Sequence, residues 1–428
     1  MYFQYKNSTG LSDEQIRETS PKLDEYKDKL KSVIQSGTYE AAESSVNLST
    51  DETLLNTVQN LVEKKKTVTL KYIVVIGIGG SNLGTKAIYD AIHGYYDLFE
   101  PARFPKMIFL DTQDENVLSK VVPLLSSCSS TEEFLINAIS KSGGTTETMT
   151  NLEVLSSSLS QKFSDITDRI VFTTDEGSNM HKKATELGFD AILMPKQVGG
   201  RFSVLSAVGL FPLALAGFDI VKLRRGAANM RDICGKRAFT EDNPAMISAS
   251  ILYLLSEQGK NINDNFTFLP QLESLGKWYR QLMGESVGKD GKGITPTVSV
   301  GSTDLHSVGQ LYLGGPKDKI TTFIYSREQL TNLAVAENLQ YNLVPVIKGK
   351  KIHSIMNAIV QGTKIAYKNQ GLPFMEIGFE KTDEESLGEF MQFKMIEIMY
   401  LGHLMDVNTF DQPHVELYKI ETKKILEE

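Results

Sequence analysis

The sequence predicts an α/β protein with two doubly wound, mainly parallel sheets in tandem and a helix at its C-terminal end. Three observations lead to this fold class. Short apolar runs alternate with helical patterns, a glycine-rich turn joins one such run directly to a helix, and the alternation starts again at about Asp219. Such a rhythm is typical of parallel sheets with helices on both faces.

Two helices are expected before the first sheet. The first spans about residues 12–36, opens with a capping box at Ser12 and Gln15, and is interrupted near Pro21. The second begins near Thr50 and carries an apolar stripe. The strands of the first sheet, each followed by a helical pattern, are predicted at 73–78, 107–111, 134–139 and 169–174.

The second half of the chain repeats the alternation. Helices are predicted at 220–234 and 244–258, strands at 265–269, 297–301, 319–325 and 374–379, and a last helix at 412–426. We therefore expect one α/β domain over residues 50–218 and a second one formed by residues 1–49 and 219–428. The apolar helix after Ser203 is expected to be buried or to form part of a subunit contact.

Composition favours a soluble enzyme of a reducing compartment. The 428 residues include 45 basic and 53 acidic side chains, and the net charge of −8 argues against a nucleic-acid partner. Cys128 and Cys234 are the only cysteines, so neither a disulfide framework nor a thiolate zinc cluster is expected. The N-terminal residues lack a signal-peptide core and no apolar run could span a bilayer, so we expect a cytoplasmic protein without a membrane contact.

The stretch from Val74 to Gly84 carries the first candidate site. A β-branched run ends in Gly77-Ile78-Gly79-Gly80-Ser81, and a helical pattern starts at Leu83. Small residues let the backbone approach a ligand, and the N–H groups of a helix start favour an anion. The alternatives are a turn that needs small residues only for packing and a dinucleotide site, whose glycine fingerprint the spacing fits loosely.

A second loop, Ser140-Lys141-Ser142-Gly143-Gly144-Thr145, follows the strand at 134–139 and opens a helix. Three hydroxyl groups and one ammonium group at a helix start suit a phosphate monoester. The alternative is a capping turn rich in serine and threonine. Both loops are expected at the carboxyl end of one sheet, where ligands of such folds bind, and this favours a phosphate site.

Together these stretches resemble the glucose-6-phosphate isomerase family over nearly the whole chain. Each motif alone is a weak match, but six occur in the family's order. They are Gly77-Ile78-Gly79-Gly80-Ser81, Ser140-Lys141-Ser142-Gly143, Gly199-Gly200-Arg201, Gly284-Glu285-Ser286, Asp304-Leu305-His306 and the stretch from Phe410 to Lys419. The resemblance implies flavodoxin-like sugar-isomerase domains and reversible isomerisation of glucose 6-phosphate and fructose 6-phosphate through a cis-enediolate, without a cofactor, in glycolysis and gluconeogenesis.

The family's residue roles can be carried over to the matching positions. The resemblance implies that Glu285 moves a proton between C1 and C2, that His306 and Lys419 assist opening of the sugar ring, and that Arg201 faces the intermediate. It also implies a homodimer with shared active sites, in which the histidine comes from the neighbouring subunit. The residues implied in substrate binding are Gly80, Ser81, Ser140, Lys141, Ser142, Thr145, Gln281 and Gln412.

The chemistry of the isomerisation agrees with these roles. Removing a weakly acidic proton beside a carbonyl needs one base that reaches two adjacent carbons, and the Glu285 carboxylate has that reach. Charge develops on oxygen in the enediolate, which a fixed guanidinium such as that of Arg201 stabilises. Taken singly, Glu285 could be a solvated turn residue, Arg201 a surface residue, and Lys419 an i, i+3 partner of Glu416.

Other functions and two departures from the family pattern remain open from the sequence. The rivals are a nucleotide-dependent oxidoreductase, a phosphosugar sensor without activity, and an isomerase of mannose or amino-sugar phosphates. No metal is predicted, because the histidines other than His306 lack metal-ligand spacing. The family commonly has glycine at the position of His414 and threonine at that of Gly144.

Overall fold

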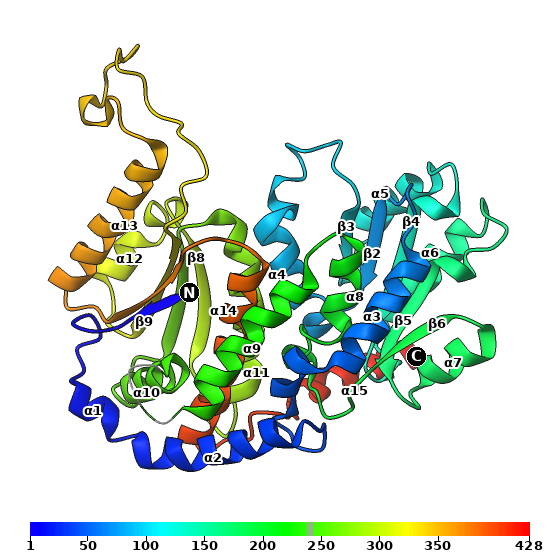
Figure 1. The fold of residues 1–428 in the computed structure, drawn as a ribbon, viewed down its shortest axis with the longest axis horizontal. Coiled ribbons are helices and arrows are strands. Elements are labelled where there is room, and N and C mark those ends of the chain that lie inside the picture. Colours follow the sequence, from blue (N-terminus) through cyan, green and yellow to red (C-terminus); the bar gives the residue numbers. More distant parts are fainter. Residues whose placement is uncertain (238, 240–242) are drawn as a thin grey trace.

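The computed structural model describes residues 1–237, 239 and 243–428, and it contains two five-stranded sheets, one in each half of the molecule (Figure 1). Each sheet has buried apolar side chains on both of its faces, which separate helices cover. This is the layered arrangement of a doubly wound α/β protein.

All strands of the first sheet are parallel, in the order β3-β2-β4-β5-β6. They are β2 (Tyr72–Ile76), β3 (Lys106–Leu110), β4 (Phe134–Ile139), β5 (Ile170–Asp175) and β6 (Asp190–Met194). This is the flavodoxin-like order 2-1-3-4-5. The sequence patterns predict the first four strands but not β6, a short edge strand that pairs only with β5 and leaves Leu193 exposed.

The second sheet has the order β1-β10-β9-β7-β8. Its strands are β1 (Tyr2–Gln4), β7 (Ile262–Thr267), β8 (Thr295–Val300), β9 (Lys319–Ser326) and β10 (Phe374–Phe379). The four later strands are parallel and follow the same flavodoxin-like pattern, while the unpredicted β1 adds an antiparallel edge. The predicted fold class, two mainly parallel doubly wound sheets, is confirmed.

The strand β7 begins three residues earlier than its apolar pattern predicts. Asn263 and Asp264 are polar, yet both are fully buried in the sheet. The Asn263 amide donates to the Ile320 carbonyl oxygen of β9, and the Asp264 carboxylate accepts from the hydroxyls of Thr297 and Ser299. Hydrogen bonds across the sheet thus compensate the free-energy cost of burying these polar groups. The same polar residues interrupt the apolar pattern, which is why the sequence does not predict the start of the strand.

The N-terminal helices begin and are interrupted where the sequence predicts. The first expected helix is two helices, α1 (Asp13–Arg17) and α2 (Ser20–Ser36), with Pro21 in the first turn of α2. The Ser12 hydroxyl accepts from the Gln15 N–H, and the Gln15 side chain accepts from the Ser12 N–H, so the capping box is confirmed.

The remaining helices cover the two sheets. Those of the first half are α3 (Glu52–Lys65), α4 (Leu83–Ile92), α5 (Glu115–Ser126), α6 (Thr146–Leu159), α7 (Asn179–Leu187) and α8 (Ala207–Leu215). Those of the second half are α9 (Ile220–Lys236), α10 (Pro244–Glu257), α11 (Glu273–Val287), α12 (Gly309–Gly314), α13 (Ile352–Asn369), α14 (Glu384–Leu404) and α15 (Val415–Glu427).

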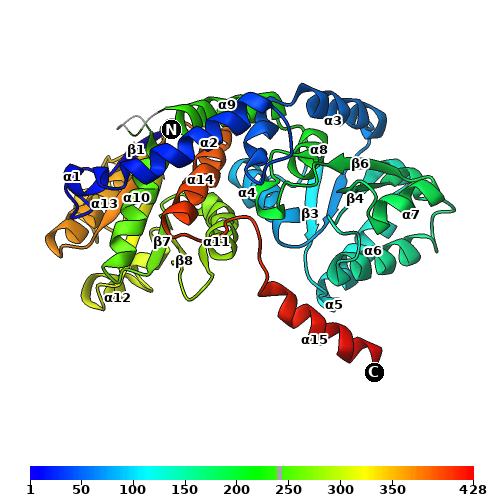
Figure 2. The ribbon, with the colours of Figure 1, turned by 90° about the horizontal axis from the view of Figure 1, so that it is seen from below.

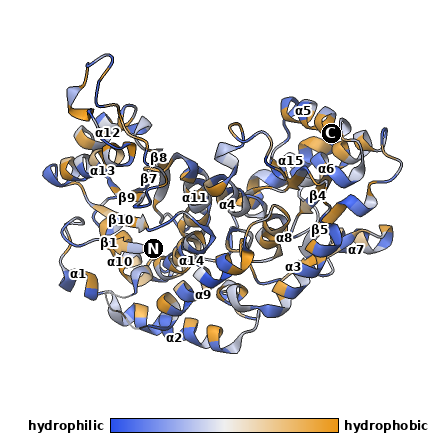
Figure 3. Cartoon of the chain, turned by 45° about the horizontal axis from the view of Figure 1, so that its top comes forward, coloured by the Kyte–Doolittle hydropathy of each residue, from blue (hydrophilic) through white to orange (hydrophobic). Residues whose placement is uncertain are grey.

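One continuous apolar core joins the two halves. α8 is almost wholly buried in it, as predicted, and is strongly apolar in Figure 3. α4 of the first half packs against α11 of the second. Gly84 permits this contact, since a Cβ atom there would lie 2.7 Å from Val204 and 3.4 Å from Trp278.

Two segments stand away from the body. The first, called the arm here, is the connection between β9 and α13 (residues 327–351), which projects beyond α13 in Figure 1. The second is α15, which has no buried residue and lies apart from the rest of the chain in Figure 2. Within the described ranges, no helix is both long and apolar enough to cross a membrane.

Candidate active site

Glycines bring three distant segments together at the turn between β2 and α4. A Cβ atom on Gly80 would lie 2.1 Å from the carbonyl carbon of Gly200, so only glycine fits where these two loops touch. Gly79 has a φ of +59°, and a Cβ atom there would lie 2.7 Å from Nε2 of Gln281. Packing therefore explains both glycines, and it places the Arg201 loop and the end of α11 beside the first anion loop.

Arg201 is the centre of this meeting point. Its side chain is 2% exposed. The Nη1 group donates to Glu285 Oε2 at 3.2 Å and to Gln412 Oε1 at 2.9 Å, and the Nε group donates to Ser286 Oγ at 2.8 Å. The guanidinium is therefore held in one orientation between a carboxylate and an amide.

The third guanidinium nitrogen holds the segment before α15. Nη2 of Arg201 donates to the backbone carbonyl oxygens of Thr409 at 2.5 Å and Asp411 at 3.1 Å. Burial lowers the pKa of Arg201 from its ordinary value, and Glu285 opposes that shift. Because a guanidinium is too basic to lose its proton in a protein, the group stays a cation.

Glu285 lies in the last turn of α11 with its carboxylate 29% exposed. Its Oε1 accepts from Nε2 of Gln281, one turn earlier, at 3.1 Å, and its Oε2 faces Arg201. The structure thus brings together four of the residues singled out in the sequence, Glu285, Arg201, Gln281 and Gln412. A positioned carboxylate beside a fixed cation is suited to proton abstraction with stabilisation of the resulting anion.

The two anion loops follow the carboxyl ends of neighbouring strands of the first sheet. β2 and β4 pair in parallel, so the loops that follow them, with Ser81 and Ser140, are neighbours. Ser81 ends the short turn Gly79–Ser81, and α4 begins at Leu83. The Ser81 hydroxyl therefore stands beside a helix start, where N–H groups favour an anion.

Hydroxyl groups organise the second loop from inside. Ser140 Oγ lies 2.9 Å from Thr145 Oγ1 and accepts from the Gly143 N–H at 3.1 Å. Ser142 Oγ accepts from the Gly144 N–H at 3.3 Å. Thr145 occupies the N-cap of α6 without a side-chain cap bond, so the first turn of that helix keeps N–H groups for a ligand.

Lys141 joins the phosphate loop to the loop that carries Arg201. Its Nζ donates to the carbonyl oxygen of Val198 at 3.1 Å, three residues before Arg201. Burial lowers the pKa of Lys141 from its ordinary value, Lys196 adds to the shift and Asp175 opposes it. The ammonium group is thus partly desolvated, which strengthens its attraction to a phosphate.

His306 lies far from Glu285 of the same chain. Gly284 of α11 lies against Pro296 near the start of β8, whereas His306 follows the other end of that strand and is exposed. The length of β8, roughly 15–20 Å at about 3.3 Å per residue, therefore separates the two side chains.

Lys419 does not contact this cluster either. It lies on α15, where its Nζ pairs with Glu416 Oε1 at 2.7 Å, and both side chains are about half exposed. The structure therefore contains the i, i+3 surface pair of Lys419 and Glu416 that the sequence analysis gave as the alternative. Gln412, in contrast, lies before α15 and reaches Arg201.

Sequence reasoning did not assign several groups of the site. Ser286 binds Arg201 and stands within a motif quoted above, but a serine beside a glutamate gives no separate signal. The carbonyl oxygens of Val198, Thr409 and Asp411 also take part. Every residue type has a carbonyl group, so no residue pattern could have revealed them.

The two departures from the family pattern fit the local backbone. A Cβ atom on Gly144 would meet nothing within 4 Å, so this position tolerates either glycine or a larger residue. His414 has a φ of −71°, which any residue can adopt. Over the part of the chain described, no three His, Cys, Asp or Glu side chains gather closely enough to hold a metal ion.

The doubly wound fold, the two loops at helix starts and the guanidinium that faces a carboxylate are consistent with an α/β protein of the phosphosugar-isomerase class. The model of the phosphoglucose isomerase family matches residues 23–319. This is more than half of the sequence, and the chain belongs to the phosphoglucose isomerase family. The resemblance stated from the motifs is thereby confirmed.

Similar proteins agree with this family. A protein of Methanocaldococcus jannaschii named glucose-6-phosphate isomerase is 34% identical over 368 residues, 86% of each chain. One of Carboxydothermus hydrogenoformans is 34% identical over 83% of this chain and 79% of its own. Among solved structures, a hypothetical protein of Thermus thermophilus has a TM-score of 0.87 with 28% identity over 99% of both chains. A glucose-6-phosphate isomerase of Chlamydia trachomatis has a TM-score of 0.81 with 20% identity, over 99% of this chain and 88% of its own, which shows the shared fold.

Proposed function

We propose that the protein interconverts glucose 6-phosphate and fructose 6-phosphate, as an aldose–ketose isomerase of glycolysis and gluconeogenesis. The observation that carries this proposal is the convergence of Glu285, Arg201, Gln281 and Gln412 next to two anion loops. Relatives named glucose-6-phosphate isomerase, 34% identical over most of both chains, support the same reaction.

The reaction assigns one task to each group. Ser81 and the loop from Ser140 to Thr145 hold the phosphate, which leaves the sugar carbons toward Glu285. The carboxylate takes the proton from C2 of the open aldose, and the cis-enediolate that forms is stabilised by Arg201. The same carboxylate returns a proton to C1, while the hydroxyl proton of O2 moves to O1, so the ketose results with all atoms conserved.

An isotope experiment tests the proposal. Fructose 6-phosphate is incubated with the protein in heavy water, without added metal or cofactor, and the carbons C1 and C2 are followed by NMR. Proton transfer through Glu285 exchanges the migrating hydrogen, so deuterium should appear at C2 of the aldose. Turnover in which no deuterium ever enters at either carbon would instead favour direct hydride migration and would contradict the proposal.

Replacing Lys141 by alanine should raise KM for phosphorylated substrates by about tenfold or more, since a charge-assisted hydrogen bond is lost, and should change kcat less. Because burial lowers the pKa of Lys141, wild-type affinity should also begin to fall at a pH below the ordinary lysine range, as the ammonium loses its proton. Steady-state kinetics measure both. An equal effect on unphosphorylated ligands would contradict a phosphate contact.

We also propose a homodimer with shared active sites. His306 is too far from Glu285 to act in its own chain, as its place beyond β8 indicates. The arm exposes Leu330, Leu333, Tyr341, Leu343, Val344 and Val346, and α15 exposes Leu417, Tyr418, Ile420, Ile425 and Leu426. Apolar surface of this extent is typical of a protein contact, and a second copy of the chain is the proposed occupant.

Mixing two inactive variants tests the shared site. In a dimer of one Glu285→Gln chain and one His306→Ala chain, one of the two sites has both intact residues. Random exchange of subunits should therefore restore about a quarter of wild-type activity. If both residues acted within one chain, no mixture would regain activity. Each variant refolded alone is the matched control.

We propose two domains, one over residues 50–218 and one formed by residues 1–49 and 219–428. The strands β2–β6 fall within residues 50–218, and the other sheet comes from residues 1–49 and 219–428, which supports the proposed boundaries.

We also propose a cytoplasmic location. Cys128 and Cys234 are buried and unpaired, which supports a reducing compartment such as the cytoplasm.

A further inference from the structure

The turn after α11 carries a buried ammonium group to which the proposed reaction gives no task. Lys289 lies four residues after Glu285, and its side chain is 6% exposed. Its Nζ pairs with Asp411 Oδ1 at 2.7 Å and donates a hydrogen bond to the backbone carbonyl oxygen of Asn408. Burying an ammonium group costs free energy unless its donors find partners, so these two contacts fix where the side chain lies.

Lys289 and Arg201 hold the same short segment, residues 408–412, at different atoms. Arg201 Nη2 donates to the backbone carbonyl oxygens of Thr409 and Asp411. Lys289 binds the carboxylate of Asp411 instead. Asp411 is therefore bound by one cation through its carbonyl oxygen and by a second cation through its carboxylate.

These contacts form a closed ring that passes through α11. Glu285 and Ser286, in the last turn of the helix, bind the guanidinium of Arg201. Arg201 binds Asp411, and Asp411 binds Lys289 just beyond the end of the same helix. Two independent connections thus hold residues 408–412 relative to the Glu285 carboxylate.

Gln412 depends on this segment for its position. Its side-chain oxygen accepts from Arg201 Nη1 at 2.9 Å, but the residue is exposed, and α15, which begins at Val415, has no buried residue. Packing against the core therefore does not hold Gln412. Within the segment, Asn408 Nδ2 donates to Asp411 Oδ2 at 2.7 Å, so fixing the Asp411 carboxylate also fixes the turn that leads to Gln412.

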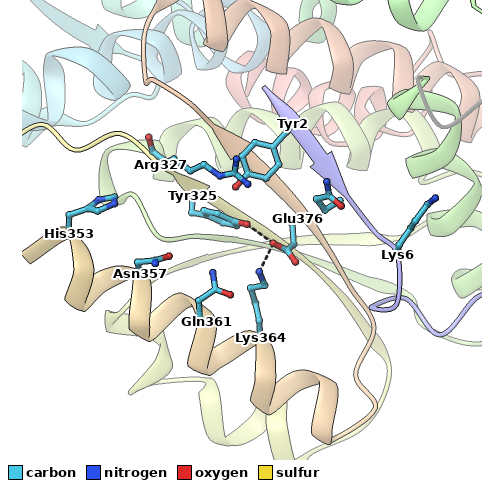
Figure 4. A pocket seen from close by; sticks show the side chains of 11 residues that line it. Tyr2, Lys6, Tyr325, Arg327, His353, Asn357, Gln361, Lys364 and Glu376 are labelled. Atoms are coloured by element: carbon cyan, nitrogen blue, oxygen red, sulfur yellow. Dashed lines mark hydrogen bonds and ion pairs between the residues drawn. The ribbon is translucent and has the colours of Figure 1, made fainter. Parts of the chain in front are cut away.

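An ion pair elsewhere in the fold provides a comparison. Lys364 of α13 pairs with Glu376 of β10 at 2.7 Å, and their side chains are 17% and 12% exposed (Figure 4). Both residues line a pocket between α13 and the β1–β10–β9 edge of the second sheet. None of the residues that contact Arg201 lines this pocket, so the pair links packed elements without reaching the candidate site.

We propose that Lys289 is a positioning residue for Gln412. By fixing the carboxylate of Asp411, its ammonium group keeps the Gln412 amide against Arg201. This role rests on the proposed isomerase function, in which Gln412 is one of the substrate-binding residues. Lys289 itself does not touch the sugar. A displacement of about 1 Å at a group that orients the substrate can lower the rate by about a hundredfold, so the contact matters to the reaction.

Steady-state kinetics of Lys289→Met tests the role. The substitution keeps about the length of the side chain and removes its charge. We expect kcat to fall by about ten- to a hundredfold and KM to change by less than about threefold, because the loops proposed to hold the phosphate are untouched. Lys364→Met, the matched control, should lower the melting temperature and leave both constants unchanged. A kcat of Lys289→Met equal to that of Lys364→Met overturns the proposal.

A double-mutant cycle shows whether Lys289 acts through Gln412. The variant Gln412→Ala removes the amide that is held in place. Adding Lys289→Met to it should lower kcat by less than about a further twofold, since the group to be positioned is already absent. If the two losses multiply, Lys289 acts by another route and the proposal is wrong.

Hydrogen exchange of the full chain provides a measurement that needs no turnover. The amides of residues 408–412 should exchange faster in Lys289→Met than in the wild type. Lys292→Met is the control from the same turn, because Lys292 is exposed and donates to the Met405 carbonyl oxygen, before the segment, at 2.8 Å. It should leave exchange at 408–412 unchanged. Wild-type exchange in Lys289→Met contradicts the positioning role, whereas a wild type without turnover contradicts the proposed isomerase function alone.

Discussion

Replacing Glu285 by glutamine is expected to lower kcat by about two to four orders of magnitude and to leave the affinity for phosphosugars nearly unchanged. The amide has the shape of the carboxylate, and its oxygen can still accept the hydrogen bond from Arg201 Nη1. That bond is 3.2 Å long in the unsubstituted protein. It cannot take a proton from carbon. Steady-state kinetics and equilibrium binding of substrate together measure the two effects.

Glu273→Gln provides the control for that experiment. Glu273 starts the same helix, pairs with Lys277 and is about half exposed, so the same substitution there should leave kcat unchanged. If Glu285→Gln retained activity close to that of Glu273→Gln, another base would have to move the proton, and the role given to Glu285 would be wrong.

Lys394→Met is expected to lower the free energy of unfolding by about 3–5 kcal/mol, because it leaves a buried carboxylate without its cation. Lys394 Nζ lies 2.8 and 3.1 Å from the two oxygens of Glu397, and both side chains are fully enclosed between α10, α11 and α14. Among the residues that the structure describes, the hydroxyls of Ser248 and Tyr279 would then be the remaining partners of Glu397. Denaturant unfolding measures the loss.

Two variants show whether the missing cation is the cause. Lys277→Met breaks an exposed pair and should cost no more than about 1 kcal/mol. The double variant Lys394→Met with Glu397→Leu removes both charges and should regain most of the lost stability. A loss for Lys394→Met as small as that for Lys277→Met would contradict the expected penalty of an unpaired buried charge.

Apolar periodicity predicts most of the fold because most strands are buried on both faces. β4, fully buried along Phe134–Ile139, is predicted to the residue. The pattern fails where burial does not depend on apolar side chains. Asn263 and Asp264, the second and third residues of β7, are held there by hydrogen bonds, and β1 has three residues at an edge, too few for any period to show.

The candidate site was predictable in part. The motifs identify Glu285 and Arg201, but the contact between them depends on Gly80 and Gly200 touching across two loops, which no local pattern encodes. The prediction for Lys419 rests on the resemblance, while local spacing favours its pair with Glu416, and a single chain contains the local contact. The position of Lys419 relative to Arg201 depends on how α15 is placed, and residues near Lys419 in the sequence do not determine that placement.

The bond between Lys141 and the Val198 carbonyl oxygen has a consequence for substrate choice. It connects the loop proposed to anchor the ester directly to the loop of the guanidinium and restrains the distance between them. The span from phosphorus to the proton-accepting carboxylate is then a property of the scaffold. We therefore expect a sugar with one carbon fewer between its ester and its carbonyl to be held too short to reach Glu285, so that chain length is selected before any hydroxyl group is recognised.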